Sequence, residues 1–178
     1  MKKIFFILFV LMVAFTSAKS YEITLSENVS AVEISENSYQ RLDVLFNFEG
    51  INTIEVETTE GIFNELIIPG TYSTKEIGAP KLPSAKELIV IPFGAEVSVK
   101  TLNYNIMEYL LSDHGITNLI MPVQPSLSKS QNPGDIEFAY NEEMYMQKYN
   151  TELVNVEILG VMRGVRLARL TVNPINYD

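Results

Sequence analysis

Alternation of apolar and polar residues is the main pattern along this chain. Residues 41–48 place four apolar side chains on one face, and residues 53–58 alternate again with acidic side chains facing out. A two-residue period is typical of half-buried strands. The other segments that we expect to form strands are 21–25, 31–35, 66–68, 88–91, 96–104, 154–159 and 165–172.

Helical signals are few. Residues 141–149 predict one short helix, with Asn141 as its N-cap and acidic residues in the first turn. Residues 106–111 fit a helical turn or a strand. Because many short strands alternate with glycine and proline punctuation, the sequence predicts an all-β fold, an antiparallel β-sandwich of jelly-roll-like type with one short helix.

The N-terminus has the features of an export signal. Two lysines precede an unbroken apolar run over residues 4–15, and small residues follow it. This pattern predicts cleavage after Ala18 or after Ser20, and the run is shorter than the roughly 20 residues that a membrane span needs. We therefore expect a signal peptide over residues 1–20, and a domain over residues 21–178 that is secreted to the periplasm or cell surface of a bacterium. No membrane contact is expected after the signal is removed.

Composition narrows the possible functions. The chain has 178 residues with no cysteine, one histidine, and 13 basic against 22 acidic side chains. The lack of cysteine excludes disulfides, thiolate metal sites and a cysteine nucleophile, and the net charge of −9 argues against nucleic acid as a partner. Ser112, Asp113 and His114 are adjacent, so they cannot take the geometry of a hydrolytic triad. We expect no enzymatic activity, cofactor or metal in this chain.

One long segment lacks apolar periodicity. Residues 122–135 contain Pro122, Pro125 and Pro133, which favour extended backbone. The sequence predicts an exposed, semi-rigid loop with Lys129 near its middle. This lysine is either an ordinary solvated side chain or a basic group presented to a pocket.

A second group of basic residues lies near the C-terminus. Arg163, Arg166 and Arg169 are spaced by three, which does not match one face of a flat strand. A bulge near Gly164 would accommodate them. They either pair with acidic residues on a neighbouring strand or form a basic spot that faces a partner.

Three blocks of sequence resemble the propeptides of gingipain-type proteases. Residues 77–83 (IGAPKLP) and 88–97 (LIVIPFGAEV) are similar to the G-x-P-x-L-P … L-x-x-x-P-[YF]-G-A core of that family. Residues 121–130 resemble its P-x-Q-P segment, and residues 161–177 resemble its closing R-G-x-R … N-P-x-x-Y block. The blocks occur in the family's order and span residues 65–178.

The resemblance implies a β-sandwich prodomain from the N-terminus of a secreted cysteine endopeptidase specific for Arg or Lys. Such prodomains assist folding, cover the active-site cleft and are removed by cleavage after basic residues. We therefore expect residues 21–178 to be a gingipain-like propeptide domain, truncated at its C-terminus, that keeps its protease latent. Its partner would be the cognate catalytic domain in the same precursor.

The resemblance also suggests which residue contacts the protease. A pocket for Arg or Lys contains a carboxylate that attracts a cation, and a stiff loop lowers the ordering cost of binding. Lys129 is the first candidate for a substrate mimic in that pocket, and Arg163 or Arg166 is the second. The competing functions are a free-standing adhesive or ligand-binding sandwich at the cell surface and a diffusible protease inhibitor.

Overall fold

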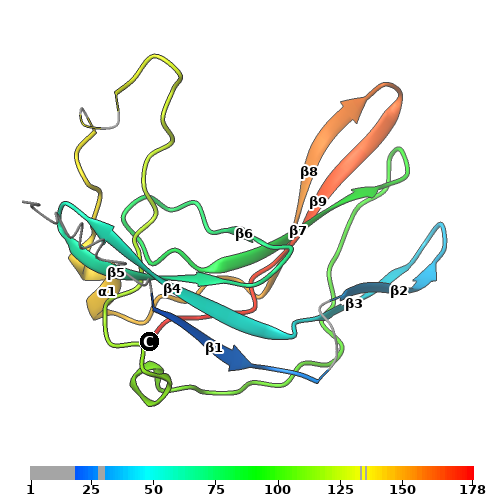
Figure 1. The fold of residues 1–178 in the computed structure, drawn as a ribbon. Coiled ribbons are helices and arrows are strands. Elements are labelled where there is room, and N and C mark those ends of the chain that lie inside the picture. The colour runs from blue at the N-terminus through cyan, green and yellow to red at the C-terminus, as the bar shows by residue number, and fades with distance from the viewer. Residues whose placement is uncertain (1–18, 28–30, 133, 135) are drawn as a thin grey trace, which may run out of the picture.

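The computed structural model describes residues 19–27, 31–132, 134 and 136–178 as antiparallel sheets linked by long irregular segments (Figure 1). One sheet has the order β1-β4-β5 and another has the order β6-β7-β9-β8, while β2 and β3 form a separate hairpin. The strands are β1 (Ser20–Thr24), β2 (Ala31–Asn37), β3 (Leu42–Asn47), β4 (Gly50–Thr58), β5 (Gly61–Ile67), β6 (Tyr72–Ser73), β7 (Pro83–Val90), β8 (Val154–Met162) and β9 (Val165–Val172). The prediction of an all-β antiparallel fold is confirmed.

The helical elements are short. A 3-10 helix, η1 (Leu111–His114), begins where the ambiguous segment 106–111 ends, and α1 (Glu142–Met146) occupies part of the predicted helix. The Asn141 side chain accepts a hydrogen bond from the Glu143 N–H, which confirms the predicted N-cap. The helix ends at Met146 because Gln147 has extended backbone.

The alternating pattern placed most strands correctly. In β9 the buried residues Ala168, Leu170 and Val172 recur at every second position, and the predicted range 165–172 matches the strand. Two strands begin earlier than predicted, β5 at Gly61 and β7 at Pro83.

The strand predicted over residues 96–104 is wrong. This segment has no regular secondary structure, although Val97, Val99 and Leu102 show the alternation of a strand. These side chains are all exposed. Alternation forms a strand only when a neighbouring backbone supplies the ladder of hydrogen bonds, and no strand pairs with this segment in the sheets that the structure describes.

The arginine-rich segment also differs from its prediction. Gly164 lies in the turn of the β8–β9 hairpin, and the register irregularity is in β8, between Ile158 and Gly160. The turn places Arg163 at the hairpin tip and the other two arginines on β9. A bulge near Gly164 was expected, but the chain reverses direction there. The turn therefore separates Arg163 from the two arginines on β9.

The N-terminal prediction falls mostly outside the described residues. Residues 1–18, including Ala18, are not described, whereas Ser20 is the first residue of β1 and pairs with Ile54. Across the described part of the chain, no helix is long and apolar enough to cross a membrane.

The hydrophobic core joins the β1-β4-β5 sheet to irregular segments. Its buried members are Ile23, Ile51, Leu66, Ile68, Leu82, Ile116 and Ile120. Three of these residues lie in strands and the others lie in the connections between elements. The core therefore fixes the connections as well as the sheets.

Candidate functional site

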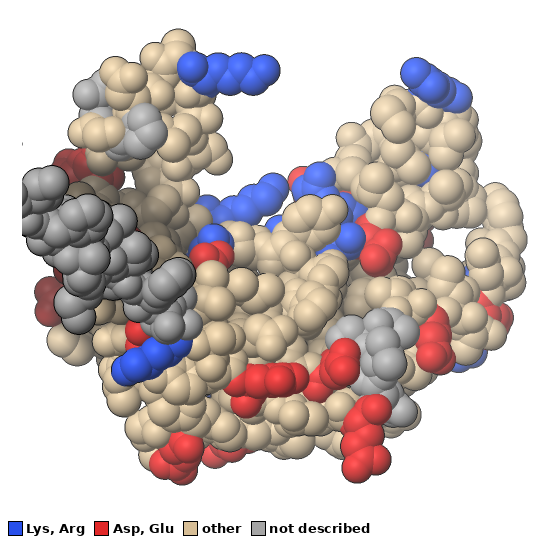
Figure 2. All heavy atoms as spheres, in the orientation of Figure 1, with Lys and Arg blue, Asp and Glu red and all other residues tan. Residues whose placement is uncertain are grey.

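Two arms project from the body of the protein on the same side (Figure 1). The loop arm consists of residues 124–132, and the hairpin arm consists of residues 158–167 at the distal end of β8 and β9. Figure 2 shows a hollow between them, with a basic side chain at each tip and further basic side chains on the floor over β6 and β7. Lys129 is the only basic residue of the loop arm, and Arg163 occupies the turn of the hairpin arm.

Lys129 lies in a tight turn at the loop tip. The Gln131 N–H donates to the Ser128 carbonyl at 3.1 Å, and the Ser128 N–H donates to the Gln131 side-chain Oε1 at 3.0 Å. The hydroxyl oxygens of Ser128 and Ser130 lie 3.2 Å apart, within hydrogen-bond distance. These contacts close a four-residue turn in which Lys129 and Ser130 are the central residues. The Lys129 side chain is exposed at the tip of the loop arm.

The Gln124 side chain clamps the base of the loop arm. Its Nε2 donates to the Ala139 carbonyl at 2.9 Å and to the Pro122 carbonyl at 3.1 Å, while the Ala139 N–H donates to its Oε1 at 3.0 Å. Gln124 is partly buried, so these bonds are shielded from water. The outgoing and returning backbones of the arm are therefore tied together by one amide.

The Gly78–Ala79 segment holds this base against the body. Gly78 donates to the Val123 carbonyl, Val123 donates to the Ala79 carbonyl and Asn141 donates to the Gly78 carbonyl, at 2.9 to 3.0 Å. Gly78 has a φ of 83°, and a Cβ there would lie 3.1 Å from the Asn141 nitrogen. Both conformation and space therefore favour glycine at this position.

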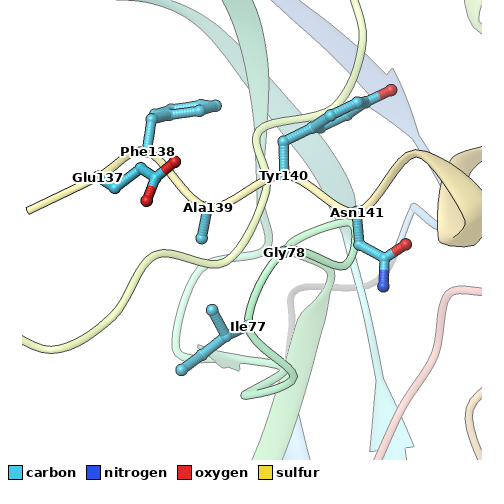
Figure 3. Close-up of a pocket in the computed structure, with 7 residues that line it drawn as sticks. All are labelled: Ile77, Gly78, Glu137, Phe138, Ala139, Tyr140 and Asn141. Carbon is cyan, nitrogen blue, oxygen red and sulfur yellow. The ribbon is translucent and has the colours of Figure 1, made fainter.

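A shallow depression marks the same junction (Figure 3). It has a volume of about 320 Å³ and is lined by Ile77, Gly78 and residues 137–141. In Figure 3 the Ile77 and Ala139 side chains point toward each other, and Tyr140 and Phe138 point away on the opposite side of the backbone. The depression therefore lies where the returning side of the loop arm meets the Ile77–Gly78 segment.

Aromatic residues also hold the base of the loop arm. The Tyr145 hydroxyl donates to the Ile120 carbonyl at 2.6 Å, and burial raises the pKa of Tyr145 well above its usual range. The Phe63 and Phe138 rings lie 5.4 Å apart, which links β5 to the returning side of the loop. The arm is therefore fixed at its base by packing and hydrogen bonds from distant parts of the chain.

The closing N-P-x-x-Y block has a similar supporting role. The Asn173 side chain accepts from the Ser84 hydroxyl at 2.8 Å and donates to the Glu152 carbonyl at 2.8 Å. Tyr177 exchanges backbone hydrogen bonds with Tyr149 at 2.8 and 3.1 Å. These contacts fix the end of the chain against β7 and against the segment that follows α1.

In the hairpin arm, the basic residues differ in their surroundings. Arg163 is exposed in the turn with a positive φ of 52°, an unfavourable conformation for a residue with a side chain. The Arg166 guanidinium donates to the carbonyls of Pro92 and Ala95, each at 2.8 Å. Arg166 therefore caps the Pro92–Ala95 turn of the P-F-G-A motif.

Arg169 and Lys75 both lie close enough to Lys86 for their charges to affect it. Arg169 donates to Glu157 at 3.0 Å on the adjacent strand β8, so the expected cross-strand pairing occurs for this arginine. Partial burial lowers the pKa of Lys86, and the positive charges of Lys75 and Arg169 lower it further. Lys86 also donates to the Ser73 carbonyl at 2.8 Å and lies over the Tyr72 ring.

Lys75 and Lys86 were not predicted as functional residues. The structure brings Lys86 near Arg169 through the register of β7 on β9. Leu88 pairs with Arg169, and Lys86 lies two residues from Leu88 on the same face of the sheet. That register cannot be inferred from either strand alone, because the two strands are about 80 residues apart in the chain.

The three polar residues considered as a triad lie outside both arms. Ser112, Asp113 and His114 lie within η1, and the His114 ring contacts Tyr109 at a centroid distance of 5.7 Å. Within the described ranges, no group of three or more acidic or histidine side chains could hold a metal ion. The main features of the site are the exposed Lys129 and Arg163, each at the tip of an arm whose backbone is held by hydrogen bonds.

The described residues form an antiparallel β domain that presents a basic side chain on a supported loop. More specifically, the chain belongs to the Propeptide_C25 family, whose profile matches residues 19–178. It is 39% identical over 163 residues to the Lys-gingipains HG66 and W83 of Porphyromonas gingivalis. The match covers 90% of this chain and spans 9% of the length of each of these relatives.

Two solved structures share the fold. A structure described as giving insight into the zymogenic latency of gingipain K from Porphyromonas gingivalis aligns with a TM-score of 0.84 and 38% identity, covering 90% of this chain and 88% of the other. The complex of the RgpB pro- and mature domains from the same organism aligns with a TM-score of 0.68 and 19% identity, covering 83% and 75%. The second likeness concerns the fold alone.

Proposed function

We propose that this chain is the secreted propeptide of a gingipain-like cysteine endopeptidase and keeps that protease latent by covering its active-site cleft. It would form the N-terminal part of a longer precursor and would also assist folding of the catalytic domain. The observation that carries the proposal is Lys129, an exposed lysine held at the tip of an arm whose base is fixed by Gln124 and Gly78.

Lys129 is the residue proposed to enter the specificity pocket. Its ammonium group is exposed, and its turn is fixed, so little conformational freedom remains to be lost on binding. Arg163 is also exposed and remains the second candidate, whereas the Arg166 guanidinium is already engaged by two carbonyls. Filling the pocket with Arg166 would cost both of these hydrogen bonds.

The names of the similar proteins support the choice of a lysine over an arginine. The relatives are named Lys-gingipains, and one of the similar structures concerns the latency of a gingipain zymogen. A lysine would fit a pocket selective for lysine as a substrate mimic.

We further propose that residues 1–20 are a leader cleaved after Ala18 or Ser20, and that the domain acts in the periplasm or at the cell surface. A free-standing adhesive is not favoured, because family membership already accounts for the fold.

The test is inhibition of mature Lys-gingipain from Porphyromonas gingivalis by the purified chain. We expect Lys129→Ala to weaken the inhibition constant by about 30-fold or more, because truncating a dominant interface residue costs about 2 kcal/mol or more. Lys100→Ala is the matched control, since Lys100 is an exposed lysine outside both arms. A Lys129→Ala chain that inhibits as well as the parent would overturn the assignment.

A further inference from the structure

A residue that fills a protease pocket is normally also a cleavage site. If Lys129 enters a lysine-selective pocket, the Lys129–Ser130 peptide bond lies next to the catalytic centre. The further inference rests on the proposed function and concerns why this bond would survive long enough for the loop to inhibit.

The turn at the loop tip offers a physical reason. The backbone bond from Gln131 N–H to the Ser128 carbonyl places Lys129 and Ser130 at the two central positions of a β-turn. Peptides bound along protease clefts are extended, as in strand addition, and the central residues of a turn are not. A turn can therefore present the lysine side chain while its peptide bond is misaligned for attack, and misplacement by about 1 Å can cost about 100-fold in rate.

The Gln131 side chain adds a second hydrogen bond across this turn. Its Oε1 accepts from the Ser128 N–H at 3.0 Å, so the same two residues are joined by a backbone and a side-chain hydrogen bond. Gln131 is exposed, and both of its turn contacts are with Ser128. Loss of its side chain should therefore loosen the turn and leave the core of the domain unchanged.

We propose that Gln131 is a positioning residue that keeps the Lys129–Ser130 bond in a turn, so that the loop acts as an inhibitor and is cleaved only slowly. Slow cleavage is ordinary hydrolysis. The bond between the Lys129 carbonyl carbon and the Ser130 nitrogen breaks, water supplies the second oxygen of the Lys129 carboxylate, and the two protons of that water end on the Ser130 nitrogen, which becomes an ammonium group. The rate of this step would set the lifetime of latency.

The experiment follows cleavage of the whole chain by catalytic amounts of mature Lys-gingipain, using intact-mass spectrometry over time. Gln131→Ala should be cut after Lys129 about fivefold faster than the parent, the factor expected when one ordinary hydrogen bond is lost. Gln131→Glu should restore the parental rate, because a carboxylate oxygen can still accept from the Ser128 N–H.

An internal reference makes the comparison independent of protease activity. Lys100 is exposed in an irregular segment, so cleavage after Lys100 should proceed at the same rate in every variant. Circular dichroism of each variant checks that the domain remains folded. Equal rates after Lys129 in the parent, Gln131→Ala and Gln131→Glu would overturn the inference.

The two proposals fail in different ways. If Lys129 does not occupy the pocket, Lys129→Ala leaves the inhibition constant unchanged. If the turn does not protect the bond, inhibition still depends on Lys129 but the cleavage rate after Lys129 does not depend on Gln131. A faster Gln131→Ala cut that Gln131→Glu fails to slow would also contradict the role given to the amide oxygen.

Discussion

The two arms present their basic residues by opposite means. The hairpin arm is supported along its length by the pairing of β8 with β9, and its tip is a turn in which Arg163 and Gly164 both have positive φ. The loop arm has no strand pairing over residues 124–132 and is held at two points, the Gln124 clamp at its base and the Ser128–Gln131 turn at its tip.

This difference indicates which arm is better suited to enter a protease cleft. A strand pair fixes its whole length, so the hairpin arm cannot easily adapt to a cleft. The loop arm keeps the tip and base rigid and leaves the backbone between them unpaired. Such an arrangement can deliver one side chain into a pocket with little loss of entropy at the fixed tip, while the unpaired stem adjusts to the cleft. The comparison therefore favours Lys129 over Arg163 as the inhibitory residue.

The largest effect is expected where the loop arm meets the body. Gly78→Ala should lower the free energy of unfolding by about 2–3 kcal/mol, because a side chain is strained at positive φ and its Cβ would crowd Asn141. Gly70→Ala is the matched control, with a φ of 78° and nothing within 4 Å of the added Cβ, and should cost about 1 kcal/mol. Urea denaturation measures both. Equal losses would show that the junction with Asn141 is not tightly packed.

At the hairpin arm, the corresponding change is Arg166→Ala. Two carbonyls at Pro92 and Ala95 lose their charged donor, so the free energy of unfolding should fall by about 2 kcal/mol. Inhibition by the folded fraction should be unchanged, and Arg163→Ala should stay within about 0.5 kcal/mol of the parent. If Arg166→Ala abolished inhibition without loss of stability, the hairpin arm would be the one that enters the pocket.

The two arms also show which features could be predicted from the sequence and which could not. The exposed loop around Lys129 was predicted because prolines and the lack of apolar periodicity are local signals, and β9 was predicted because its alternation is strong. The role of Arg166 was missed because its partners lie more than 70 residues earlier in the chain. Gln124 and Gln131 were missed because an isolated glutamine has no spacing signal, and its meaning depends on which backbone groups it meets.

A smaller effect is expected at alkaline pH, and only near the loop arm. Burial and the neighbouring Glu76 raise the pKa of Tyr149 to about 12 from 10.0, and burial raises the pKa of Tyr177. A pKa raised in the folded state gives stability that is complete below pH 10 and is lost as the pH rises toward 12. Hydrogen exchange should therefore accelerate around Glu76 before it does so in the hairpin arm, which contains no tyrosine.

Tyr149→Phe separates this titration from general alkaline unfolding. The variant should lose less stability than the parent between pH 10 and pH 12, because the titrating hydroxyl is gone. Tyr39→Phe, at a tyrosine that is 79% exposed, is the control and should follow the parental profile. A Tyr149→Phe profile identical to that of the parent would rule out this tyrosine as the cause.

The smallest change is expected at the tip of the hairpin arm. Arg163→Asn should raise the free energy of unfolding by about 0.5 kcal/mol, since Asn-Gly is the preferred pair in a two-residue turn with positive φ at both positions. Inhibition should not change. Thermal denaturation of the variant beside the parent measures the difference, and weaker inhibition would assign Arg163 a contact with the protease.

Lysine reactivity in the complex tests the central claim most directly. The chain is acetylated with and without mature Lys-gingipain whose catalytic cysteine is replaced by alanine, and modification of each lysine is followed by peptide mass spectrometry. The account predicts that Lys129, exposed in the free chain, becomes protected in the complex by about tenfold or more, as expected for an ammonium group that is desolvated and paired with a carboxylate, while Lys100 reacts at its free rate. Unchanged acetylation of Lys129 in a complex that forms would contradict the claim that this lysine occupies the pocket.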